Sequence, residues 1–204
     1  MESQHDPVLP GRACGGCTLC CKVLTIQELG KPQGEWCAHC EVGRGCTIYS
    51  GRPGECRDFH CGYLAWPMIR EHWYPATSKM VLVSELDGTR LAIHVDPARP
   101  DAWRGKPYYD EIKQMARLAA AKMQQVMVCI RDKAIIILPD EDVDLGPIAD
   151  DERIIIGETM VNGRSKLRAM KVHVDDPRVA GMKAGVPTAL GRAVSQALSE
   201  QRKG

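Results

Sequence analysis

Nine of the ten cysteines in this chain of 204 residues lie within its first 61 residues. They are Cys14, Cys17, Cys20, Cys21, Cys37, Cys40, Cys46, Cys56 and Cys61. A deprotonated thiol is a strong ligand for zinc and iron. Metal binding is therefore the first function that the sequence suggests.

The spacing of the thiols is typical of metal ligands. Three pairs are separated by two residues: Cys14 and Cys17, Cys17 and Cys20, and Cys37 and Cys40. A tight turn at this spacing brings both sulfur atoms within reach of one ion. Gly15 and Gly16 favour such a turn, because glycine tolerates strained backbone conformations.

Cys20 and Cys21 are adjacent, and neighbouring side chains diverge on a regular backbone. We therefore expect them to bind different metal atoms, in about two sites that lie close together. Two sites of four thiolates need eight of the nine cysteines. His39 and His60 are interpreted as residues outside the ligand set, because the thiols suffice.

Residues 1–12 are predicted to form a flexible leader, and residues 13–66 a metal-binding module. The segment 13–62 contains few aliphatic residues besides Val23, Leu24 and Ile26. It cannot bury enough apolar surface to fold alone, so a bound metal would supply the missing folding energy.

Composition and the lack of apolar segments indicate the cellular compartment. The chain is 44% hydrophobic and 26% charged, with a formal net charge of +1. We see neither a signal peptide nor an apolar run of membrane-spanning length, and we expect a cytoplasmic protein without a membrane partner. Because cytosolic thiols are kept reduced, metal ligation is favoured over disulfides.

The order of the motifs resembles the CxxCxxCC family of zinc- or iron-chelating proteins, also called YkgJ-like cysteine cluster proteins. After the opening run come Trp36-Cys37, Cys46-Thr-Ile-Tyr49 and the segment Arg52-Pro-Gly-Glu-Cys56-Arg-Asp-Phe-His-Cys61. The resemblance covers residues 12–66 and implies metal chelation without a reaction. It has no ligand at Cys40. The predicted ligands are Cys14, Cys17, Cys20, Cys21, Cys37, Cys46, Cys56 and Cys61.

The identity of the metal stays open between zinc ions, iron ions and an iron–sulfur cluster. A bacterial ferredoxin run has its fourth cysteine four residues after the third, followed by proline. Cys21 comes too early for that position, which favours zinc or mononuclear iron. A cluster with a more distant fourth ligand remains the alternative.

Residues 67–204 are predicted to form an α+β domain of antiparallel hairpins and helices. Asp87-Gly88 and Asn162-Gly163 are type I′ turn signals between apolar segments. We expect the strand pairs 80–86 with 89–95, 125–131 with 134–138, and 153–161 with 164–174. Helices are expected at 107–123 and around Leu190, Val194 and Leu198.

Three functions follow from these observations. The first is metal chelation, the second an iron–sulfur redox protein or enzyme, and the third a zinc-stabilised module that binds protein or nucleic acid. Residues 1–61 hold six basic and seven acidic residues, a balance that argues against nucleic acid. No catalytic residue and no protein partner is assigned, and the sequence does not decide whether the protein is an enzyme. Cys129 is interpreted as a buried strand residue.

Overall fold

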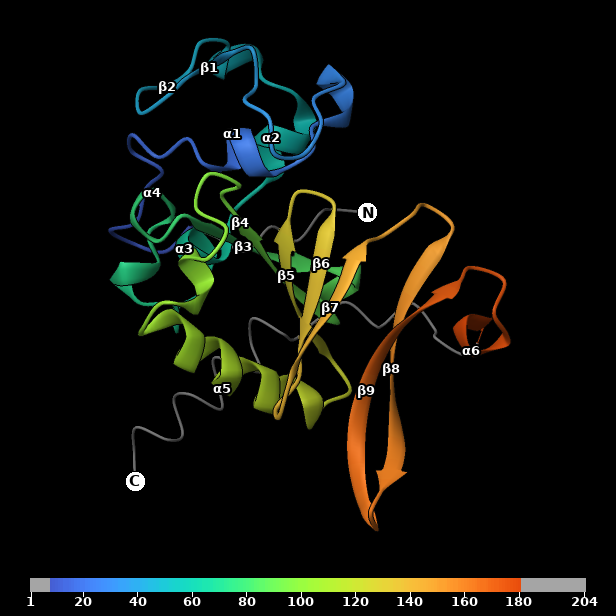
Figure 1. Ribbon diagram of the computed structural model, residues 1–204. Helices are drawn as coiled ribbons and strands as arrows, with labels where there is room; N and C mark the ends of the chain where they lie inside the picture. The colour runs from blue at the N-terminus through green and yellow to red at the C-terminus, as the bar shows by residue number, and fades with distance from the viewer. Residues whose placement is uncertain (1–7, 181–204) are drawn as a thin grey trace.

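The computed structural model describes residues 8–180 and confirms a mixed α+β fold (Figure 1). A cysteine-rich N-terminal region of short helices packs on a sheet domain, as predicted. Within residues 8–180, no helix combines the length and the apolar character needed to cross a bilayer. The predicted helix around Leu190, Val194 and Leu198 lies outside the described residues.

The N-terminal region consists of very short elements. Its helical segments are α1 (Cys20–Val23), η1 (Gln27–Leu29), η2 (Tyr49–Gly51), α2 (Gly54–Asp58) and α3 (Gly62–Ala65). A two-residue pair, β1 (Cys40–Glu41) with β2 (Gly45–Cys46), is its only sheet among the described residues. Two further segments, η3 (Glu71–Trp73) and α4 (Pro75–Ser78), lead into the domain.

The domain is built on one five-stranded sheet. The strands are β3 (Met80–Glu85), β4 (Arg90–Val95), β5 (Gln125–Ile130), β6 (Lys133–Ile137) and β7 (Asp142–Pro147), in that spatial order. The predicted pairs β3–β4 and β5–β6 are antiparallel, as expected. The pair β4–β5, which joins these two antiparallel hairpins, is parallel, so the sheet is mixed.

The parallel pair requires a crossover connection, which α5 (Tyr108–Ala120) supplies together with η5 (Ala102–Arg104). The helix predicted over 107–123 is therefore present but shorter. Its buried residues are Ile112, Met115, Ala116 and Ala119, which belong to the same hydrophobic cluster as the sheet. This spacing places them on one face of the helix.

Both predicted hairpin turns have the expected backbone. Asp87 and Gly88 have φ values of 53° and 85°, and the amide of Thr89 donates to the carbonyl of Leu86. Asn162 and Gly163 have φ values of 51° and 74° between β8 (Glu152–Val161) and β9 (Arg164–His173). These two strands form a separate ribbon that extends beyond the five-stranded sheet, and α6 (Pro177–Ala180) follows them (Figure 1).

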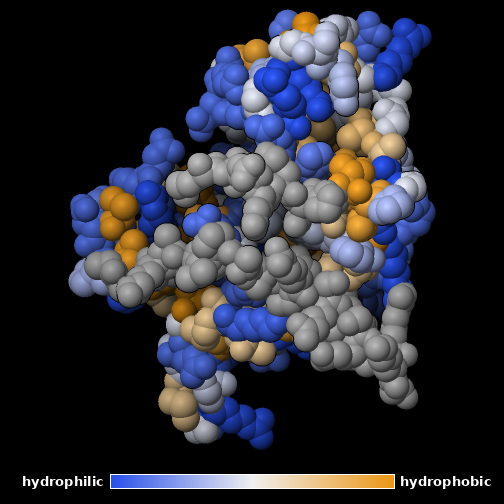
Figure 2. Space-filling model, turned by 180° about the vertical axis from the view of Figure 1, so that it is seen from behind, coloured by the Kyte–Doolittle hydropathy of each residue, from blue (hydrophilic) through white to orange (hydrophobic). Residues whose placement is uncertain are grey.

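Two hydrophobic clusters form the core. The larger contains α5, one face of the sheet and residues of the N-terminal region, including Leu19 and Val23. The smaller lies on the opposite face, where Ile154 of β8 is buried against Met127 and Ile136. On the molecular face seen in Figure 2, hydrophobic residues form small separate groups among hydrophilic ones.

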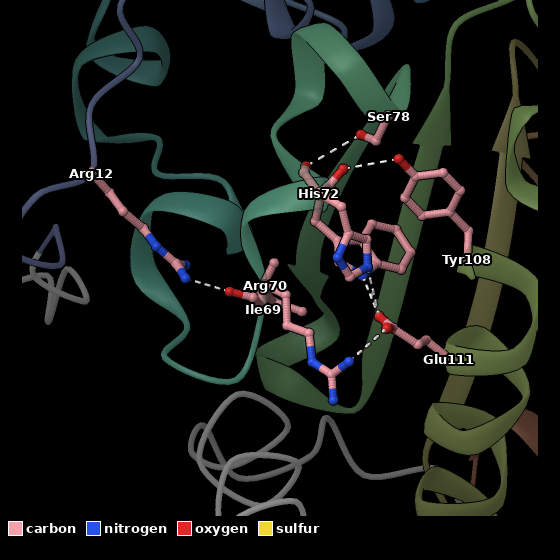
Figure 3. A network of polar contacts seen from close by, with 8 residues as sticks. Arg12, Ile69, Arg70, His72, Ser78, Tyr108 and Glu111 are labelled. Atoms are coloured by element: carbon pink, nitrogen blue, oxygen red, sulfur yellow. Dashed lines mark hydrogen bonds and ion pairs between the residues drawn. The ribbon is translucent and has the colours of Figure 1, made fainter. Parts of the chain in front are cut away.

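A polar network joins the segment before β3 to α5 (Figure 3). The Glu111 carboxylate accepts a hydrogen bond of 2.6 Å from the indole of Trp73 and lies 3.2 Å from His72 Nε2. Arg70 lies 3.6 Å from the same carboxylate, and the Tyr108 hydroxyl donates to the carbonyl of His72. Because Trp73 is fully buried, its indole needs this partner, and the network therefore stabilises the fold.

Gly62, the first residue of α3, is predicted to be intolerant of a side chain. A Cβ atom there would lie 2.4 Å from Cε3 of Trp66, whose ring is buried. Gly62→Ala should lower the free energy of unfolding by about 1–3 kcal/mol, because the ring must move within a packed core. Gly157→Ala is the control, since its Cβ meets no atom within 4 Å. Equal melting temperatures for the two variants would contradict the prediction.

Candidate metal centre

Seven of the eight predicted ligands line one cavity of about 780 Å³ in the N-terminal region. These are Cys14, Cys17, Cys20, Cys21, Cys37, Cys46 and Cys56. The eighth, Cys61, lines a smaller cavity of about 70 Å³ together with Cys14, Cys17, Cys20 and Cys56. The fold therefore brings all eight thiols to the walls of two cavities that share four of them.

The first thiols lie on a tight turn. The Cys17 amide donates a hydrogen bond of 2.8 Å to the Cys14 carbonyl. Gly15 has a φ of 52°, which favours glycine, and a Cβ on Gly16 would lie 2.8 Å from the carbonyl oxygen of Gly43. The two glycines thus allow both the turn and the close approach of the loop that precedes β2.

Helix α1 begins at Cys20, so Cys20 and Cys21 occupy consecutive helical positions. The Cys37 amide donates to the Cys21 carbonyl at 3.0 Å, which places the second half of the region beside the helix. The Cys40 amide in turn donates to the Cys37 carbonyl at 3.0 Å. This is the second Cys-x-x-Cys turn that the sequence predicts.

The remaining thiols come from three separate elements. Cys46 on β2 is the register partner of Cys40 on β1. Cys56 lies within α2, and Cys61 directly precedes α3. Cys37 and Cys61 are buried, Cys14 is exposed and the other thiols of the region are half-buried.

Side chains of both parts hold the region against the sheet. The Tyr74 hydroxyl donates a hydrogen bond of 2.8 Å to the Cys14 carbonyl, and Lys22 forms an ion pair of 2.6 Å with Asp96. Arg12 donates to the carbonyls of Tyr63 and Trp66 and also to that of Ile69, as Figure 3 shows. Arg12, the last residue of the predicted leader, is therefore anchored.

Burial disfavours the thiolate form of several of these cysteines. It raises the pKa values of Cys14, Cys17 and Cys56, and it raises that of Cys61 to about 11. Arg52 opposes burial at Cys14 and Cys56 because its charge favours the thiolate. The Arg52 guanidinium itself lies 4.2 Å from the centroid of the Tyr49 ring.

Cys21 differs from its neighbours. A hydrogen bond from the Cys20 thiol, aided by a second from Cys40 and by the charge of Lys31, lowers the pKa of Cys21 to about 6. The same Cys20–Cys21 bond, together with burial, raises the pKa of Cys20 well above its usual value. Burial raises the pKa of Cys40 to about 11. These contacts stabilise Cys21 as a thiolate between the thiols of Cys20 and Cys40.

Lys31 is a functional candidate that the sequence did not indicate. It is only 6% exposed, and its ammonium group donates to the carbonyls of Lys22 and Leu24. Burial lowers the pKa of Lys31, but the nearby Cys21 and Cys37 favour its charged form. A buried cation beside thiolates offsets their charge. No pattern in the sequence distinguishes this lysine from a surface residue.

His39 lines the larger cavity, whereas His60 lies beside Cys61 in sequence but lines neither cavity. Cys40 also lines neither cavity and contacts Cys21 instead. Cys129 is buried in β5, as predicted, and burial raises its pKa strongly.

The donor set fits a thiophilic metal, but the described side chains are not gathered into a finished coordination sphere. All ten cysteines are free thiols. In the described range 8–180, no three His, Cys, Asp or Glu side chains converge closely enough to hold one ion. Metal binding would therefore require changes of side-chain rotamer or loop position around the cavity.

No family model matches the chain, and neither a curated protein nor a solved structure shows significant similarity to it. The resemblance of residues 12–66 to the CxxCxxCC family therefore rests on the motifs themselves and stays a prediction.

The contacts of Cys21 predict that it is the most reactive of these thiols in reduced, metal-free protein. Its alkylation by iodoacetamide should accelerate as the pH rises through about 6, because the thiolate fraction grows. Cys61, with a pKa of about 11, should react slowly at neutral pH. Peptide mapping by mass spectrometry measures both rates.

Cys20→Ala tests whether the hydrogen bond from the Cys20 thiol causes this reactivity. The variant removes that bond, which is the largest contribution to the lowered pKa of Cys21, so the midpoint of Cys21 alkylation should move to higher pH. An unchanged midpoint in this variant, or equal rates for Cys21 and Cys61 at about pH 7, would show that the thiol contact does not control reactivity.

Proposed function

We propose that this protein chelates zinc or iron through the clustered thiolates of its N-terminal region. The observation that carries the proposal is the placement of seven free thiols around one cavity, with an eighth in the cavity beside it. The six thiols other than Cys56 and Cys61 precede Cys56 by ten or more positions in the sequence. Their arrangement around the same cavities therefore depends on the tertiary structure and not on local spacing alone. Soft thiolate ligands select zinc, copper(I) and iron over hard cations.

The same residues support a structural effect of the metal. Four thiols that lost their protons on metal binding would carry four negative charges, and a divalent cation would cancel half of that charge. Arg52 and Lys31 provide further positive charge near Cys14 and Cys21. Metal binding would replace protons on thiols with raised pKa values, so the affinity should fall as the pH is lowered.

We also propose a cytoplasmic location and membership of the CxxCxxCC family. Ten free thiols suit a compartment in which cysteines are kept reduced. The motifs in residues 12–66 support the family assignment. Neither part of this proposal specifies a substrate, a pathway or a protein partner.

One observation favours an iron–sulfur cluster as the second candidate. The larger cavity has a volume of about 780 Å³, which is in the range of small-molecule sites and far larger than a single ion needs. Apolar residues such as Ile26 and Phe59 also line it. A cluster in such surroundings would serve electron transfer or redox sensing, with potentials set by charge and solvent exposure.

The metal content of protein purified without oxygen tests the proposal. We expect about two zinc or iron atoms per chain if the sites are mononuclear. Elemental analysis gives the identity and the number. A colourless protein would indicate zinc, and a brown one with broad absorbance near ~400 nm would indicate a cluster. Far less than one metal atom per chain in protected samples would refute chelation.

Cys17→Ala should reduce the metal content and the thermal stability of the N-terminal region, because a lost ligand removes folding energy that the metal contributes. Chelator treatment should lower the melting temperature of the wild type, by roughly 2–4 °C per kcal/mol, more than that of the variant. Cys129→Ala is the matched control, since that thiol is buried in β5 away from the cavities. Identical metal content in all three proteins would contradict the role of Cys17.

A further inference from the structure

The two cavities differ in the thiols that they do not share. Cys61 lines only the smaller cavity, whereas Cys21, Cys37 and Cys46 line only the larger. The shared thiols are Cys14, Cys17, Cys20 and Cys56. This distribution allows the eight thiols to be divided between two sites, a division that the sequence left open.

We propose that the protein has two separable sites for thiophilic divalent cations, zinc or iron(II), each formed by four thiols. The inner set consists of Cys14, Cys17, Cys20 and Cys61. The outer set consists of Cys21, Cys37, Cys46 and Cys56. This proposal rests on the proposed function and adds the grouping of the ligands.

The inner set lies against the sheet domain. Its distinguishing member, Cys61, lines the smaller cavity together with Tyr74 and Val81. The Tyr74 hydroxyl also holds the first turn in place, because it donates a hydrogen bond to the Cys14 carbonyl. Cys14 and Cys17 line the same smaller cavity as Cys61. The first turn and Cys61 therefore face the same space.

The outer set lies farther from the sheet, around the β1–β2 pair. The Cys37 amide is hydrogen-bonded to the Cys21 carbonyl, and Cys46 lies on β2. Cys56 lies on α2 and lines both cavities. We assign Cys56 to the outer set because Cys21, Cys37 and Cys46 line only the larger cavity and need a fourth thiol.

Helix α1 carries one thiol of each set. Cys20 and Cys21 are consecutive helical residues, so their side chains leave the helix in directions about 100° apart. Cys20 lines both cavities, whereas Cys21 lines only the larger. The adjacent pair thus supplies one ligand to each set, and the two sites lie close together without sharing a sulfur atom.

Two basic side chains lie near thiols of both sets. The buried Lys31 ammonium acts on Cys21 and Cys37 of the outer set and on Cys20 of the inner set. Arg52 acts on Cys14 of the inner set and on Cys56 of the outer set. A site of four thiolates and one divalent cation carries a net charge of about −2. Cations in both places reduce the repulsion between two such neighbouring sites.

Cys40 belongs to neither set. It contacts Cys21 and Thr18 and lines neither cavity. It therefore provides a control thiol from the same region.

The test compares pairs of substitutions within one set and across the two sets. Full-length variants are reconstituted anaerobically with zinc, and native mass spectrometry counts the ions bound. The wild type and Cys40→Ser should bind about two ions, and Cys61→Ser or Cys46→Ser about one. The same-set double variant Cys14→Ser/Cys61→Ser should keep one ion, whereas the cross-set double variant Cys46→Ser/Cys61→Ser should keep none.

The outcomes separate the two proposals. If the wild type binds no zinc or iron, the proposed function fails. If the wild type binds two ions but every variant except Cys40→Ser loses both, the metals form one joint centre or the sites do not fold independently. Either result overturns the division into two sets, although metal binding itself would stand. Equal retention in the two double variants would also overturn it.

Discussion

Burial of α1 against the sheet domain is the interaction on which the rest of the cysteine-rich region depends. Leu19 and Val23 belong to the same hydrophobic cluster as Trp73 and the sheet residue Leu82. The region has little other apolar surface to bury, so this shared core supplies packing that it cannot provide alone. Cys20 and Cys21 lie between Leu19 and Val23, so the burial of these two residues positions both thiols.

The cysteine-rich region must bury its thiols and also accommodate the negative charge of a thiolate. Cysteine behaves as a small hydrophobic residue when protonated and as an anion when it binds a metal. Burial raises the pKa of Cys61, whereas the contacts of Cys21 stabilise its thiolate. The buried Lys31 provides positive charge near Cys21 and Cys37. The region therefore holds one thiol that is stabilised as a thiolate beside others in which burial favours the protonated form.

Local features of the fold were predictable because their causes are local. Asp87-Gly88 and Asn162-Gly163 adopt positive φ values, as a type I′ turn requires, and α5 follows the apolar spacing of Ile112, Met115 and Ala119. The parallel pairing of β4 with β5 was not predictable from their patterns. Both strands are apolar enough to pair in either direction, and the return path over α5 decides the direction.

The sequence by itself determined the chemistry of the candidate site: the number of thiols, their spacing and the adjacency of Cys20 and Cys21. Only the tertiary structure decided that Cys56 and Cys61 line different combinations of cavities, that Lys31 is buried beside Cys21, and that Cys40 lies outside the cavity walls. The physical reason is the sequence distance over which each interaction acts. Turn and helix preferences act over a few residues, whereas the grouping of distant thiols follows from packing on a sheet formed by other parts of the chain.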